Sequence, residues 1–93
     1  MEIWIRTQNK SRLLYIDKIS IEYFDEIIEK RFFKKDKIKR HWYIYDNKKY
    51  IELGEYSSYE KALKVLDMIQ KFIKTRVNGN LVFQMPNDDE VKV

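Results

Sequence analysis

The sequence contains no cysteine, one histidine, two glycines and one proline. Without cysteine, and with His41 alone, one chain cannot assemble the usual zinc ligands or a disulfide. Two glycines cannot build a phosphate-binding glycine loop. No apolar run approaches the roughly 20 residues of a membrane span, and the amino-terminal stretch lacks the basic-then-apolar order of a signal peptide. We therefore expect a soluble cytoplasmic protein with no metal, no cofactor and no membrane partner.

The 93 residues have room for one hydrophobic core. We expect a single globular domain over residues 1–86, followed by an acidic flexible tail, residues 87–93. Seven tyrosines, five phenylalanines and two tryptophans favour β-sheet. Lysine outnumbers arginine 14 to 5, which is typical of a low-GC genome. Part of the basic balance therefore reflects codon usage, and it is weaker evidence for nucleic-acid binding than usual.

One segment has a clear helical pattern, from about residue 57 to residue 75. Ser57 and Glu60 match a capping box, in which each side chain accepts a hydrogen bond from the backbone amide of the other residue. Asn78-Gly79-Asn80 is expected to end the helix, because these residues tolerate a left-handed backbone. The apolar residues recur three and four positions apart on one stripe: Tyr59, Ala62, Leu63, Leu66, Ile69 and Ile73, widened by Val65, Met68 and Phe72.

Alternation of apolar and polar residues predicts short strands elsewhere. The first three predicted strands are expected to form a meander. Gly54 is expected to turn the chain toward the helix through an unusual backbone conformation, and Pro86 is expected to end the last strand. The predicted strands are residues 1–7, 13–16, 19–24, 38–45, 50–53 and 81–85.

Residues 25–40 fit two structures. Phe24, Ile28 and Phe32 have helical spacing, but alternation over the same residues fits a strand, which is favoured. In the strand case, residues 34–37 form the tip of a hairpin. The fold class predicted is α+β: a curved antiparallel β-sheet with one long amphipathic helix, about 57–75, packed across it and a final short strand.

The net charge of +4 is concentrated in residues 30–41, which sum to +6, whereas residues 1–29 sum to −2 and residues 42–93 to zero. Such a segment, interleaved with aromatic residues, would fit phosphates and bases. It would also fit an acidic surface of a partner protein, or simply solvate a protruding tip. The candidate binding residues are Lys30, Arg31, Lys34, Lys35, Lys37, Lys39, Arg40 and Trp42.

No group of residues indicates catalysis. The acidic clusters at 25–29 and 88–90 lack the separation of a glycosidase pair or a rigid support. Ser57 and Ser58 have no base near them in the sequence and are explained by helix capping. A lone histidine on a strand is most often a structural residue. We therefore expect a protein that is not an enzyme.

Three blocks from the two ends of the chain, IWIRTQNK, LGEYSSYEKALKVLDMIQ and VFQMP, together 31 of the 93 residues, resemble small phage and prophage proteins of low-GC Gram-positive bacteria. The shared pattern is an Ile-Arg-Ser/Thr-Gln start, Leu-Gly-x-Tyr, Ala-x-x-Val-Leu in a helix, and a terminal Met-Pro. Residues 20–45 match nothing in that pattern. The resembling residues are structural, for example Gly54, Ala62 and Pro86, and no catalytic residue comes with them.

The resemblance implies a mobile genetic element in a bacterial host cytoplasm, where small non-catalytic proteins typically act by binding. The preferred hypothesis is an accessory protein that binds and inhibits a host protein, such as a defence nuclease complex, in the manner of anti-CRISPR proteins. The alternative is a nucleic-acid-binding regulator that uses residues 30–41. A homodimer through an unpaired strand edge is a further hypothesis.

Overall fold

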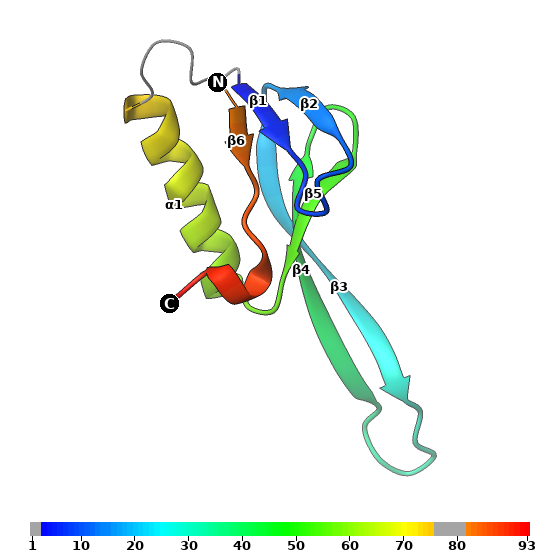
Figure 1. Cartoon of the computed structure of the whole chain (residues 1–93). Coiled ribbons are helices and arrows are strands. Elements are labelled where there is room, and N and C mark those ends of the chain that lie inside the picture. Colours follow the sequence, from blue (N-terminus) through cyan, green and yellow to red (C-terminus); the bar gives the residue numbers. More distant parts are fainter. Residues whose placement is uncertain (1–2, 76–81) are drawn as a thin grey trace.

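The computed structural model describes residues 3–75 and 82–93, and Figure 1 shows how their elements are arranged. The expected helix stop at Asn78-Gly79-Asn80 and the start of the last strand at Leu81 lie outside these residues. The α+β architecture, with one long helix packed on antiparallel strands, is confirmed. The described elements are β1 (Ile3–Arg6), β2 (Leu13–Ile16), β3 (Ile19–Glu29), β4 (Lys37–Asp46), β5 (Ile51–Tyr56), α1 (Tyr59–Thr75), β6 (Val82–Gln84) and the 3-10 helix η1 (Asp88–Glu90).

The strands form two three-stranded sheets, β2-β1-β6 and β3-β4-β5. β1 is antiparallel to β2 and parallel to β6. The predicted meander is therefore wrong at its third strand, because β3 pairs with β4 instead of β2. The lengths explain this choice: β3 and β4 have 11 and 10 residues and pair along most of that length, whereas β2 has four. The longer ladder provides more backbone hydrogen bonds and cross-strand contacts.

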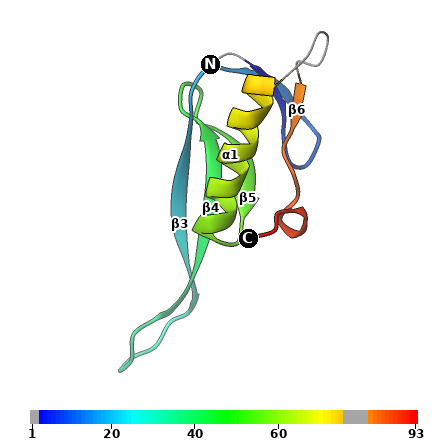
Figure 2. The same cartoon turned by 90° about the vertical axis from the view of Figure 1, so that its left-hand side faces the viewer.

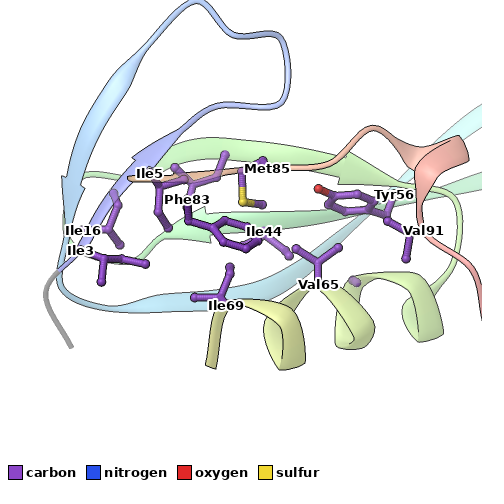
Figure 3. Packing of buried hydrophobic residues seen from close by; sticks show 12 residues of the cluster. Ile3, Ile5, Ile16, Ile44, Tyr56, Val65, Ile69, Phe83, Met85 and Val91 are labelled. Atoms are coloured by element: carbon purple, nitrogen blue, oxygen red, sulfur yellow. The ribbon is translucent and has the colours of Figure 1, made fainter. Parts of the chain in front are cut away.

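The core lies between the two sheets and α1, as Figures 2 and 3 show. Val65 and Ile69 of the helix point toward Ile44 of β4 and Phe83 of β6. Burial of each such aliphatic side chain contributes about 1.5–3 kcal/mol. The buried helical face is narrower than predicted, because three residues of the expected stripe are more than one-third exposed: Tyr59, Leu63 and Met68.

The helix starts one residue later than the capping pattern predicts. Ser58, not Ser57, is the cap, because its hydroxyl oxygen accepts the amide of Lys61 at 3.1 Å. The amide of Ser57 instead donates to a carboxylate oxygen of Asp88 at 2.8 Å. The Ser57-to-Glu60 spacing matched a capping box, but the carboxyl-terminal segment occupies the position where that box would form.

Residues 87–93, expected to form a flexible tail, lie against the start of α1 and the core. Asp88 bonds to the first turn of α1, where the ammonium group of Lys61 lies 3.3 Å from its carboxylate. Val91 is only 3% exposed and belongs to the hydrophobic core. Acidic side chains near a helix amino terminus are stabilised by the helix dipole. The acidic composition therefore reflects a contact with α1.

Gln8 joins the two sheets to the carboxyl-terminal segment. Its side-chain amide accepts from the Glu55 amide at 3.0 Å and donates to the Glu55 carbonyl at 2.9 Å and to the Pro86 carbonyl at 3.2 Å. The hydroxyl of Tyr56 donates to the same Pro86 carbonyl at 2.8 Å. Segments of the chain that are far apart in sequence, Thr7-Gln8, Leu53 to Tyr56 and Met85-Pro86, therefore meet at one structural junction.

Gly54 has a different role from the predicted turn. It lies inside β5, and its φ is outside the left-handed range that favours glycine. A Cβ atom at this position would lie 3.0 Å from the Tyr56 hydroxyl and 3.2 Å from the ring. Any larger residue at position 54 would therefore crowd the tyrosine side chain.

Residues 25–40 form a hairpin, so the favoured strand prediction is confirmed. β3 and β4 run well beyond the core, and Figures 1 and 2 show them leaving it as a two-stranded ribbon. The described chain measures 59 × 28 × 20 Å as a result. We call residues 24–41 the arm, and residues 30–36, which join its strands, the tip loop.

Candidate binding surface

The arm has only two strands along its length. β5 pairs with β4 only from Trp42 to Asp46, and β3 is an edge strand. A two-stranded ribbon is marginally stable in water unless something packs against it. The arm nevertheless exposes four large apolar side chains along its strands: Phe24, Ile27, Ile28 and Ile38. Exposed apolar surface of this extent on a small protein is typical of an interaction site.

The base of the arm is anchored by aromatic rings. The Trp42 ring packs against two others. Its centroid is 5.5 Å from the Tyr23 ring centroid on the neighbouring strand and 5.1 Å from the Tyr59 ring centroid on α1. The guanidinium of Arg40 lies 4.3 Å from the Tyr23 ring centroid, within cation–π range. The structure therefore places Trp42, a predicted binding residue, in the half-buried connection between arm and core.

The strands of the arm carry balanced charge. Arg40 donates two hydrogen bonds to Asp25, at 2.6 and 2.9 Å, and hydrogen bonding to Arg40 lowers the pKa of the Asp25 carboxyl. Lys39 pairs in register with Glu26, and Lys37 with Glu29. Residues 24–29 and 37–41 thus contribute three carboxylates and three cations, with a sum of zero.

The net charge of the arm, +3, lies entirely in the tip loop. Asp36 closes this loop by accepting the Arg31 amide at 3.0 Å. Phe32 and Phe33 are both 100% exposed, with their ring centroids 6.5 Å apart. The remaining predicted binding residues flank them in the sequence: Lys30, Arg31, Lys34 and Lys35. The tip therefore combines a cationic loop with two fully exposed aromatic rings.

The two phenylalanines are the residues that the candidate list omitted. In the sequence they lie beside strands rich in apolar residues, so a buried position fitted them. The tertiary structure shows instead that no described element covers them. The available signal was their place inside the most charged segment of the chain, since a core strand rarely carries four cations in six residues.

His41 lies on the opposite face of the sheet from the core, between two carboxylates. Its Nδ1 contacts Glu55, and its Nε2 lies 3.8 Å from Glu26. The ring stacks on Tyr43 with centroids 6.2 Å apart. Partial burial, followed by the negative charges of Glu55 and Glu52, raises the pKa of the Tyr43 hydroxyl. These contacts give His41 a structural role in joining β3, β4 and β5.

Among residues 3–75 and 82–93, no group of histidine, aspartate and glutamate side chains is arranged to hold a metal ion. Within the same ranges, no helix is both long and apolar enough to cross a membrane. Comparison with protein-family models, with curated proteins and with solved structures finds no match to this chain.

Proposed function

We propose that the chain is a non-enzymatic accessory protein of phage type that binds a host protein and inhibits or modulates it, for instance a defence nuclease complex. The observation that carries the proposal is the tip loop, with Phe32 and Phe33 fully exposed at the end of a projecting arm. Aromatic side chains that enter a partner's pocket commonly dominate the binding energy of an interface. The resemblance to phage proteins supplies the host context.

The distribution of charge favours a protein partner for the arm over nucleic acid. Binding to phosphates gains affinity when protein cations displace the counterions of the nucleic acid. Arg40 already holds Asp25, and Arg31 lies 3.4 Å from Glu29, so these two cations are partly neutralised. Lys39 and Lys37 stand opposite Glu26 and Glu29 in the strand register, which offsets their charge along the arm. The tip loop still presents two exposed phenylalanine rings and the lysines beside them, and an apolar pocket with an acidic rim on a partner protein would be complementary to these groups.

The alternative function is a nucleic-acid-binding regulator that uses residues 30–41. The observation in its favour is that Lys30, Lys34 and Lys35 surround two aromatic rings, so phosphates and bases would both find partners at the tip. Affinity would then fall steeply as salt rises, with the slope set by the number of phosphates contacted.

The test compares the wild type with two variants. The tip variant, Phe32→Ser/Phe33→Ser, removes both rings and should keep the fold, because both side chains are fully exposed. The matched control is Tyr50→Asn, which removes an aromatic side chain that is 85% exposed at the opposite end of β4. Tyr50 has a positive φ of 56°, which asparagine tolerates.

Each tagged protein is used to capture partners from a low-GC Gram-positive lysate, with and without nuclease and at two salt concentrations. The proposal predicts a protein complex that survives nuclease treatment and high salt, that the control retains, and that the tip variant loses. The captured complex is then purified and its activity measured with each protein added. Retention of nucleic acid alone, or an equal yield with the tip variant, would overturn the proposal.

A further inference from the structure

A second surface lies on the solvent face of the sheet β2-β1-β6. Alternation directs Ile3 and Ile5 of the central strand into the core and Trp4 and Arg6 outward. Tyr15 and Val82 lie beside Trp4 in register on the two neighbouring strands. We call this surface the platform, and its residues are Trp4, Arg6, Leu13, Tyr15 and Val82.

The platform presents two aromatic rings on a rigid support. Trp4 is 40% exposed and Tyr15 is 46% exposed, and their ring centroids are 5.2 Å apart with the planes tilted by 48°. Trp4 is on the central strand, which is hydrogen-bonded on both sides, so its backbone is fixed. Rings on such a sheet face can stack on an unpaired base without reorganising the fold.

The surroundings of the platform are cationic. Residues 3–16 contain Arg6, Lys10 and Arg12 and no aspartate or glutamate, and residues 82–87 add no charged side chain. These three cations line one shallow hollow together with Ser11, Leu13 and Val82. The Nε of Arg6 donates to the Lys10 carbonyl at 3.1 Å, which leaves the terminal nitrogens of the guanidinium as further donors. The nearest carboxylate in a shared hollow is Glu52, which lines a neighbouring hollow with Arg12.

We propose that the platform binds single-stranded nucleic acid. Trp4 and Tyr15 stack on consecutive bases, while Arg6, Lys10 and Arg12 contact the phosphates that follow along the hollow. A duplex is a poor ligand for this surface, because its paired and stacked bases do not offer their faces to the rings. The platform is distinct from the tip loop, so this inference does not depend on the function proposed for the arm.

The test measures fluorescence anisotropy of a fluorescein-labelled oligothymidylate of about 12 nucleotides, a length within the site sizes of comparable single-strand surfaces. Trp4→Thr removes the central ring and keeps a residue suited to a strand. It should weaken binding at least tenfold. Arg6→Gln/Arg12→Gln should also weaken binding and reduce the salt slope, from about −2 expected for three phosphate contacts on a single strand. The tip variant should bind as the wild type does.

The second variant keeps the test decisive if Trp4→Thr fails to fold, since thermal unfolding monitored by circular dichroism identifies that failure. The inference is overturned if no binding is seen at about 100 μM protein in physiological salt. Equal affinity for a duplex of the same length, or loss of binding in the tip variant alone, would also overturn it. A concentration-dependent homodimer that Trp4→Thr abolishes would overturn the inference as well, because a second copy of the chain would then occupy the platform.

Discussion

Replacing Gln8 by alanine should destabilise the protein strongly, although Gln8 is not a core hydrophobic residue. The change removes three hydrogen bonds, two to the backbone of Glu55 and one to the Pro86 carbonyl. Each bond contributes about 0.5–1.5 kcal/mol, and the backbone groups of Glu55 lose the partner that joins the two sheets. The Pro86 carbonyl keeps the Tyr56 hydroxyl as a donor. We expect a loss of about 2–4 kcal/mol in the free energy of unfolding.

Urea denaturation followed by circular dichroism measures this loss, and the melting temperature should fall by at least about 10 °C. Gln70→Ala is the matched control, because Gln70 is exposed on α1 and the same side chain is removed there. The control should change stability by no more than about 0.5 kcal/mol. If Gln8→Ala and Gln70→Ala are equally stable, the junction does not hold the sheets together and the reasoning is refuted.

Two further predictions concern the same end of the molecule. Gly54→Ala should cost about 1–3 kcal/mol in urea denaturation, since the new Cβ would lie 3.0 Å from the Tyr56 hydroxyl; a neutral effect would show that the ring moves freely. Partial burial opposes ionisation of Asp88, but bonds from Ser57 and Lys61 hold its pKa below the ordinary value of 3.8. Because the pKa of Asp88 is lower in the folded protein, its ionised carboxylate stabilises the fold above pH 3.8, and this stability is lost as the pH falls through the folded-state pKa. Asparagine cannot ionise, so Asp88→Asn should lose less stability than the wild type between about pH 5 and about pH 2. Parallel acid profiles would contradict that assignment.

Local patterns were sufficient to predict the helix and most strands. The stripe around Ala62, Val65 and Ile69 specifies a helix by itself, and alternation favoured a strand over a helix for residues 25–40 without excluding the helix. Partner choice was not predictable, because it depends on which long strands can pair, and β3 pairs with β4 across a tip loop that has no short turn motif. The cap was misplaced by one residue because Asp88, far away in sequence, bonds to Ser57.

The candidate surface was predicted only in outline. Summing charge over residues 30–41 gave +6, but β3 brings Asp25, Glu26 and Glu29 against this segment and halves the net charge of the arm. A contiguous segment does not reveal the charges of its partner strand. The exposure of Phe32 and Phe33 likewise follows from the projection of the hairpin, which depends on where β5 ends.

We propose that the tip loop inhibits a host protein, and the efficiency of phage plating measures that inhibition in the cell. A low-GC Gram-positive strain with an active nuclease-based defence expresses the wild type, the tip variant Phe32→Ser/Phe33→Ser, or the control Tyr50→Asn, at equal levels confirmed by immunoblot. The account predicts that the wild type and the control restore plating of a targeted phage, while the tip variant does not. Equal restoration by all three proteins, or no restoration by the wild type, would contradict it.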